Sequence, residues 1–270
     1  MSAPPRASRP QPLAPLGGPA GDVVREIAIE TAVALEFNGI AYAVMMATPA
    51  DLEDFITGFA IAERLIGPGD TLGEIAVSVV EAGVIVRANL PATGAARVME
   101  RARTRVAESS CGLCGIENLA ALARPLPAVA APLVLSAEAV AAALAALPHH
   151  QALGRATSAT HAAALVRTDG TIVLAREDVG RHNALDKAVG ARARQGLAGA
   201  HFALSTARCS YELVEKAVVA GLGALVTISA PTSLAIDRAG AANLPLYVLA
   251  RPDGVMQVAH QSIPRSVERG

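Results

Sequence analysis

The chain of 270 residues has no tryptophan, only three cysteines and an aromatic share of 3%. A hydrophobic fraction of 52% is still ample for a large core, which must consist mostly of alanine, valine and leucine side chains. An odd number of cysteines argues against the disulfide framework of a secreted protein and for a reducing compartment. The formal net charge of −1 provides no general basic field, so we expect no nucleic-acid partner.

The sequence also lacks a long, uninterrupted apolar run. Its most apolar window, residues 128–147, is broken by Pro132, Ser136 and Glu138, which indicates a linker and a capped helix rather than a membrane span. Residues 1–21 are rich in proline and have no apolar stretch of the signal-peptide type, so we interpret them as a disordered leader. We therefore expect a soluble, cytoplasmic protein with no membrane partner.

The rest of the chain divides into segments with different patterns. Residues 22–106 alternate short strands with helices, which predicts an α+β domain. Residues 107–132 follow as a cysteine loop and a proline-rich linker. In residues 133–270 strands and helices alternate, which predicts a domain with a largely parallel sheet. The class predicted for the whole chain is α/β.

Local signals place several elements within these domains. Asn38-Gly39 predicts a two-residue hairpin turn. Thr48-Pro49 predicts the start of a helix that residues 67–69 end, and Ser136 predicts the cap of a helix over residues 137–147. A basic helix over residues 95–106 is predicted to lead into the cysteine loop.

Polar or turn-rich segments follow four strands of the C-terminal domain. In open α/β sheets, ligands bind outside the carboxyl ends of the strands, where helix N-termini present free N–H groups. The strand predicted to end at Ala175 is followed by a polar run, and comparable segments occupy residues 205–210, 229–233 and 249–254. Together they predict a pocket for a large phosphorylated ligand, with candidate side chains Arg181, His182, Asn183, Arg208, Ser210 and Arg251. His161 is a second-rank candidate. The alternative is that Asp178 and Ser210 simply cap helices whose polar faces are solvated.

The most reactive segment is a C-x-x-C pair, Cys111 and Cys114, flanked by glycines. A zinc site needs about four ligands, and no second pair is present, so we predict no metal. The H-x-E pattern of zinc deaminases is also missing, since His161 is followed by two alanines. Glycines around the pair favour a mobile loop that carries a chemical group. They argue against the rigid helix start that a thioredoxin-like dithiol would need. Cys209 has no partner at redox or metal spacing, and we interpret it as a structural residue.

Taken together, five motifs resemble the formate dehydrogenase accessory sulfurtransferase (FdhD-type) family, a similarity that extends from about Val23 to His260. The motifs are Ser110-Cys-Gly-Leu-Cys-Gly115, Thr160-His-Ala-Ala-Ala164, Glu177-Asp-Val-Gly-Arg-His-Asn-Ala-Leu-Asp-Lys187, Ser210-Tyr-Glu-Leu-Val-Glu-Lys216 and Ser229-Ala-Pro-Thr-Ser233.

This resemblance implies a sulfur carrier that accepts persulfide sulfur from a cysteine desulfurase. The carrier then passes the sulfur to the bis(molybdopterin guanine dinucleotide) cofactor needed by formate dehydrogenase. In this family the first cysteine carries the persulfide, which corresponds to Cys111, and we treat Cys114 as assisting. The resemblance also implies a C-terminal domain with a cytidine deaminase-like α/β/α fold, a mixed sheet and no zinc. It further implies a homodimer.

The family's cofactor-binding segment corresponds to Leu249, Ala250, Arg251, Pro252, Asp253 and Gly254, and Leu249 stands where family members often have phenylalanine. One alternative is a chaperone that binds the molybdenum cofactor without covalent sulfur transfer and whose C-x-x-C pair is redox-active. A dithiol oxidoreductase is another.

Overall fold

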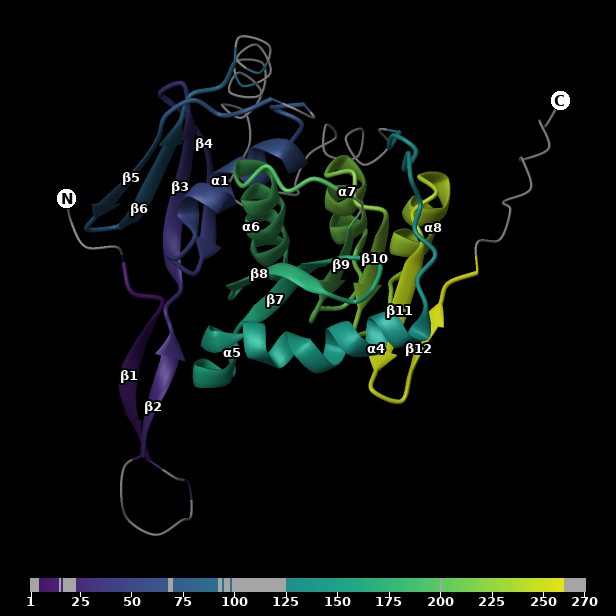
Figure 1. Cartoon of the computed structure of the whole chain (residues 1–270). Coiled ribbons are helices and arrows are strands. Elements are labelled where there is room, and N and C mark those ends of the chain that lie inside the picture. The colour runs from purple at the N-terminus through teal and green to yellow at the C-terminus, as the bar shows by residue number, and fades with distance from the viewer. Residues whose placement is uncertain are drawn as a thin grey trace, which may run out of the picture.

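The computed structural model describes residues 5–14, 16, 23–67, 70–91, 94, 98, 125–199 and 201–259. Their strands form a two-stranded hairpin, a four-stranded sheet and a six-stranded sheet (Figure 1). The elements are β1 (Ser8–Leu13), β2 (Val23–Ala28), β3 (Thr31–Phe37), β4 (Ile40–Ala47), α1 (Leu52–Ala62), β5 (Ile75–Val80), β6 (Gly83–Ala88), α4 (Ala137–Ala146), η1 (Leu147–His150), α5 (Ala152–Thr157), β7 (His161–Val166), β8 (Ile172–Asp178), α6 (Arg181–Arg194), β9 (Phe202–Ser205), α7 (Tyr211–Val219), β10 (Ala224–Thr227), α8 (Ser233–Ala241), β11 (Leu246–Arg251) and β12 (Gly254–Gln257).

The four-stranded sheet has the order β4-β3-β6-β5, and α1 covers one of its faces. The predicted turn at Asn38-Gly39 is confirmed, because both residues have positive φ and join β3 to β4. The few aromatic residues of the chain are concentrated beneath α1. Tyr42 meets Phe37 and Phe59 edge to face, with ring centroids 5.5 and 5.8 Å apart.

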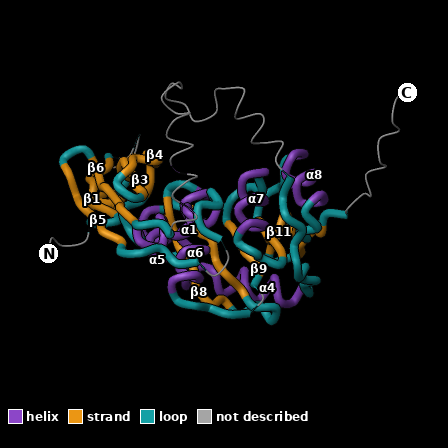
Figure 2. The backbone as a smooth tube through the Cα atoms, turned by 90° about the horizontal axis from the view of Figure 1, so that it is seen from above, coloured by secondary structure: helices purple, strands orange, loops and turns teal. Residues whose placement is uncertain are grey.

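The six-stranded sheet has the order β12-β11-β10-β9-β7-β8. Strands β8, β9, β10 and β11 run in one direction, whereas β7 and β12 run in the other. Helices α6, α7 and α8 pack on one face and α4 packs on the opposite face, which gives three layers (Figures 1 and 2). The predicted α/β class with a mixed sheet is confirmed, and so is the cap of α4, where Ser136 Oγ accepts from Ala139 N at 3.2 Å.

Helix α1 joins the two sheets by crossing α6 at very short range. A Cβ atom added to Gly58 would lie 1.7 Å from the Asp186 carbonyl oxygen, and one added to Gly190 would lie 1.8 Å from the Asp54 carbonyl oxygen. Only glycine therefore fits at either position. Beside the crossing, the buried Asp54 carboxylate accepts from Arg176 Nη2 at 2.8 Å and Arg194 Nη1 at 2.6 Å.

Three predictions of local structure are wrong, and the structure adds the start of a further helix. Residues 8–13 belong to no disordered leader, because they pair with β2 as strand β1 (Figure 1). Helix α1 begins at Leu52 and ends at Ala62, because Arg64 adopts a positive φ of 57°. Strand β8 continues beyond Ala175 to Asp178. Helix α8 has its cap at Thr232, so Pro231 precedes the helix.

The predicted linker and the predicted domain limits can be compared with the structure only in part. Residues 125–132 of the predicted linker lie against the C-terminal sheet layers, where the N–H group of Val129 donates to the Ala242 carbonyl at 2.8 Å. The cysteine pair and, except for residue 98, the predicted basic helix lie outside the described residues. The domain limits 1–21, 22–106, 107–132 and 133–270 stay predictions. None of the described helices is long and apolar enough to cross a membrane.

Candidate functional site

The carboxyl ends of four parallel strands meet at one edge of the six-stranded sheet. Register pairs β9 with β10 so that Ser205 lies beside Thr227, and β7 with β8 so that His161 lies opposite Asp178. The four segments that the sequence singles out therefore follow parallel strands at the same edge, with the start of β7 between β8 and β9. This is the position at which ligands bind in open α/β sheets.

Three of the candidate side chains converge on a single oxygen atom. Glu212 Oε2 lies 2.8 Å from His182 Nε2, 3.4 Å from Ser210 Oγ and 3.9 Å from Arg181 Nη2. His182 and Arg181 begin α6, while Ser210 and Glu212 begin α7, so both helix N-termini face this group. We call these four residues the Glu212 cluster. Its guanidinium, imidazole and hydroxyl groups are arranged to coordinate an anionic oxygen.

The electrostatics of the cluster keep its carboxylate ionised. The hydrogen bond from His182 lowers the pKa of Glu212, although partial burial opposes this shift. His161 lies nearby and is half-buried, and its Nδ1 atom is 3.4 Å from Thr206 Oγ1. Burial lowers the pKa of His161, and the positive charges of Arg181 and His182 lower it further. At neutral pH His161 is therefore an uncharged imidazole.

Asn183, another predicted pocket residue, is buried and hydrogen-bonded within the protein. Its amide nitrogen donates to the Met46 carbonyl at 2.9 Å and to Asp178 Oδ1 at 3.0 Å, and the residue is 3% exposed. Lys187, one turn further along α6, is fully buried against Asp178 with an Nζ–Oδ2 distance of 2.6 Å. Burial lowers the pKa of Lys187, and the Asp178 carboxylate opposes that shift.

This half of the long motif attaches the six-stranded sheet to the N-terminal lobe. Asp178 Oδ2 also accepts from Thr48 N at 3.0 Å, and Lys187 Nζ donates to the Thr48 carbonyl at 2.9 Å. Asp178 is not simply a helix cap, because its side chain is fully buried and its contact with Thr48 N reaches the other lobe. Glu177 instead accepts from Leu153 N and Gly154 N at the start of α5.

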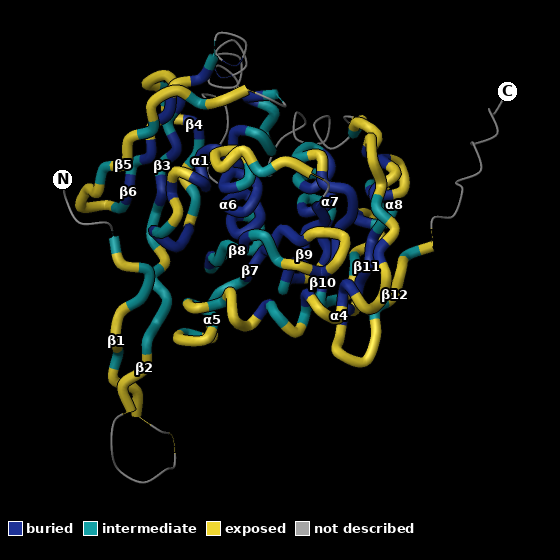
Figure 3. The backbone as a smooth tube through the Cα atoms, viewed as in Figure 1, coloured by how far each residue is buried: buried dark blue, intermediate teal, exposed yellow. Residues whose placement is uncertain are grey.

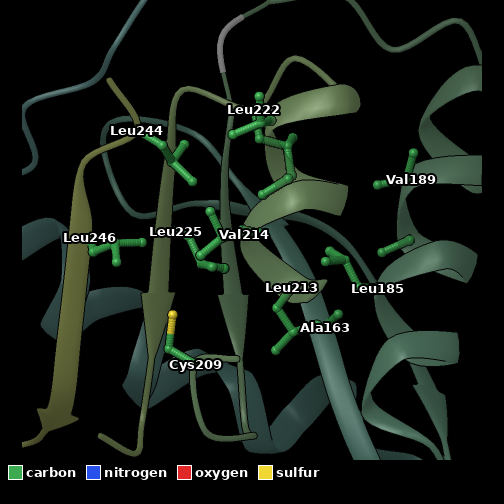
Figure 4. Packing of buried hydrophobic residues seen from close by; sticks show 14 of the residues in the cluster. Ala163, Leu185, Val189, Cys209, Leu213, Val214, Leu222, Leu225, Leu244 and Leu246 are labelled. Carbon is green, nitrogen blue, oxygen red and sulfur yellow. The ribbon is translucent and has the colours of Figure 1, made fainter. Parts of the chain in front are cut away.

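The segment after β9 separates into an exposed and a buried part. Arg208 is exposed, and no hydrogen bond or ion pair joins it to the Glu212 cluster within the described residues. Cys209 is fully buried between the sheet and α7 (Figure 4). Burial raises the pKa of its thiol to about 12, so the group is an unreactive neutral thiol at physiological pH. The sequence-based interpretation of Cys209 as a structural residue agrees with this position.

The segment over residues 249–254 turns from β11 into β12. Leu249 forms a bulge with a φ of 52° and is 44% exposed, whereas Ala250 is buried. The Arg251 guanidinium donates to the Ile228 carbonyl at the end of β10. Residues 251–254 and the first turns of α4, including Glu138, line a cleft of about 240 Å³.

Two separate surfaces therefore contain the predicted pocket residues. The Glu212 cluster lies at the starts of α6 and α7, and the cleft lies between α4 and the β11–β12 turn. No hydrogen bond or ion pair among the described residues joins the two. Cys111 and Cys114 lie outside the described residues, so their position relative to either surface stays a prediction.

Sequence reasoning missed Glu212 and the main-chain groups at Met46 and Thr48. An acidic residue in the first turn of a helix usually indicates only a favourable interaction with the helix dipole. The spacing of Glu212 two residues after Ser210 was the only local signal, and it does not predict the pairing with α6. In the part of the chain that the structure describes, no group of three or more His, Cys, Asp or Glu side chains could hold a metal ion.

Fold and site define a class of protein in which an α+β lobe is fixed to an α/β/α domain with an anion-coordinating edge. Comparison with known families narrows this class. The model of the FdhD/NarQ family matches residues 28–262. The chain belongs to this family.

Curated relatives agree with this assignment. A protein named Sulfur carrier protein FdhD from Xanthomonas euvesicatoria pv. vesicatoria is 42% identical over 245 residues, which cover 90% of this chain and 87% of that protein. One of the same name from Bordetella petrii is 43% identical over 227 residues, covering 83% and 81% of the two chains. The crystal structure of a formate dehydrogenase accessory protein from Desulfotalea psychrophila has the same fold. It matches with a TM-score of 0.71 at 21% identity, over 93% of this chain and 95% of that one.

Proposed function

We propose that this protein is a sulfur carrier that accepts sulfur as a persulfide on Cys111 and delivers it to a molybdenum cofactor. The observation that carries the proposal is the 42–43% identity, over most of the chain, to relatives named as sulfur carriers. In this proposal a cysteine desulfurase is the donor. The substrate is the bis(molybdopterin guanine dinucleotide) cofactor, and formate dehydrogenase is the enzyme served.

The proposed first step is a thiol–persulfide exchange. The Cys111 thiolate attacks the terminal sulfur of the donor's persulfide, and the electron pair of the broken S–S bond stays on the donor cysteine as a thiolate. A persulfide on Cys111 results, with no net oxidation. Cys114 is proposed to assist, and a homodimer in the cytoplasm is proposed as the working state.

The chemistry of the described residues supports this choice of cysteine by contrast. Cys209 is fully buried, and its thiol has a pKa of about 12, so it forms almost no thiolate at neutral pH. A thiol must be ionised and accessible to accept sulfur by exchange. Of the three cysteines, only Cys111 and Cys114 remain as carriers.

The Glu212 cluster and the cleft beside residues 251–254 support a phosphorylated substrate. Arg181, His182 and Ser210 together coordinate one anionic oxygen already, and a phosphate oxygen has the same requirements. The cleft is lined on one side by the segment that corresponds to the cofactor-binding segment of the family. Binding of a dinucleotide across both surfaces is part of the proposal.

The test is activation of formate dehydrogenase in cells that lack their own copy of this protein. We expect Cys111→Ala to abolish activation, with Cys209→Ala as the matched control that removes a buried thiol and keeps activity. Full activation by Cys111→Ala would contradict the proposal. If Cys111→Ser retained both activation and binding of guanine nucleotide, a cofactor chaperone without covalent sulfur transfer would replace it.

A further inference from the structure

The Glu212 cluster contains an anion that the proposed substrate site does not need. Glu212 Oε2 is the atom on which His182, Ser210 and Arg181 converge, at 2.8, 3.4 and 3.9 Å. A carboxylate at this position repels any phosphate that approaches the same donors. The Glu212 carboxylate therefore already occupies the position at which these donors would hold a phosphate oxygen.

The position of the carboxylate is adjustable. Glu212 is one-third exposed and lies at the edge of α7, where its side chain can rotate into solvent. The cluster also keeps this carboxylate charged, because the His182 hydrogen bond lowers the pKa of Glu212. His161 on the neighbouring strand is uncharged at neutral pH and adds no further cation. The balance between the Glu212 carboxylate and the donor groups of Arg181 and His182 thus decides how strongly the site attracts an anion.

The next pair of charges along the two helices is fixed. One turn after the cluster, Lys216 Nζ is 2.7 Å from Asp186 Oδ2, which is buried. Asp186 lies at the backbone crossing with α1, so its own position is fixed, and α6 and α7 cannot separate here without breaking the ion pair with Lys216. Because the helices are held here, a change at the cluster must come from the Glu212 side chain.

We propose that Glu212 is an internal counter-anion of this site, and that its carboxylate leaves when a phosphate group of the ligand replaces it. The inference deepens the proposed function by naming the residue that limits phosphate affinity. Arg181 Nε is buried without a hydrogen-bond partner among the described residues, so this guanidinium carries a donor that no described protein group satisfies. Exchange of one anion for another leaves Arg181 and His182 with an anionic partner before and after the exchange.

The proposal predicts that the protein binds a phosphate ligand more tightly when the Glu212 carboxylate is removed. Inorganic pyrophosphate is the probe, titrated calorimetrically into the full-length protein. We expect Glu212→Gln, which keeps the size of the side chain, to bind pyrophosphate at least about tenfold more tightly than the unmodified protein at low salt. Arg181→Gln should weaken binding, because it removes a donor.

The matched control is Glu215→Gln, one turn further along the same helix. Glu215 pairs with Arg238, away from the cluster, and its substitution changes the net charge by the same amount. We expect pyrophosphate affinity to stay within about twofold of the unmodified protein, since long-range charge effects are screened by salt. Glu212→Asp retracts the carboxylate but keeps the charge, and its affinity should fall between those of the unmodified protein and Glu212→Gln.

The proposal is overturned if Glu212→Gln and Glu212→Asp bind pyrophosphate no more tightly than the unmodified protein. It is also overturned if Glu215→Gln gains as much affinity as Glu212→Gln, because the effect would then be one of net charge. Sulfur loading of Cys111 by a desulfurase does not depend on either result. The counter-anion and the sulfur carrier can therefore fail separately.

Discussion

The crossing of α1 and α6 provides the sharpest test of how the two lobes are joined. In the Gly58→Ala variant the new Cβ lies 1.7 Å from the Asp186 carbonyl oxygen, whereas ordinary contact begins at 3.4 Å. The helix axes must therefore separate locally by about 1.7 Å, which reduces dispersion contacts along the whole crossing. An overlap this close places the overpacking cost at or above the upper end of the usual range, about 3–4 kcal/mol, and better helix propensity returns about 1 kcal/mol.

We expect Gly58→Ala to reduce the free energy of unfolding by about 2–3 kcal/mol. For a chain of this size, that corresponds to a decrease in Tm of about 4–12 °C. Urea titration followed by circular dichroism measures the change directly. Gly190→Ala should have a similar effect, because its Cβ would lie 1.8 Å from the Asp54 carbonyl.

The double variant refines this test. Once one methyl group has separated the helices, the second fits with less additional strain. The double variant should therefore lose clearly less free energy of unfolding than the sum of the losses of the two single variants. Strict additivity would contradict the shared crossing. An unchanged or increased Tm for Gly58→Ala would refute the packing argument itself.

The remaining predictions concern buried charges and the third thiol. Lys187→Met leaves the fully buried Asp178 carboxylate without its cation and should cost about 3–5 kcal/mol in urea titration, with the Asp178→Asn, Lys187→Met double variant more stable than Lys187→Met alone. Asp54→Ala removes a buried carboxylate that pairs with two arginines and should lower Tm by several degrees, whereas Glu53→Ala, on the exposed side of the same helix, should change the free energy of unfolding by less than about 1 kcal/mol. Cys209 should react with iodoacetamide only after denaturation, because burial raises the pKa of its thiol to about 12, and rapid labelling of the folded protein at pH 8 would contradict its placement.

Elements with local signals could be predicted from the sequence. The Asn38-Gly39 turn and the Ser136 cap depend on side chains within a few residues, and both are present in the structure. Alternation of strands and helices likewise predicted the α/β layers, because each element must bury its apolar face against a neighbouring layer. Figure 3 shows the resulting pattern of burial.

The errors arise where distant parts of the chain decide the outcome. Strand β1 contains Pro10 and Pro12, which disfavour a strand locally, yet an edge strand tolerates proline and β1 pairs only with β2. Strand β8 extends to Asp178 because its last residues are paired with β7. The residues of β1 do not identify β2 as its partner, and the residues of β8 do not identify β7.

The candidate site shows the same division. The sequence predicted which segments would gather at the carboxyl edge, because strand direction fixes that position. It could not predict that Asn183 is used up by Met46, some 137 residues earlier, or that Glu212 pairs with His182 on another helix. Polar residues in one motif thus divide between lobe attachment and the exposed edge according to contacts that no local pattern encodes.

The most direct test of the sulfur-carrier proposal is intact-protein mass spectrometry after incubation with a cysteine desulfurase and cysteine. The account predicts that the protein gains the mass of one sulfur atom, that peptide mapping locates it on Cys111, and that thiol reductant removes it. The Cys111→Ala variant should gain nothing. Sulfur found only on Cys114 or Cys209, or an undiminished gain by Cys111→Ala, would contradict the account.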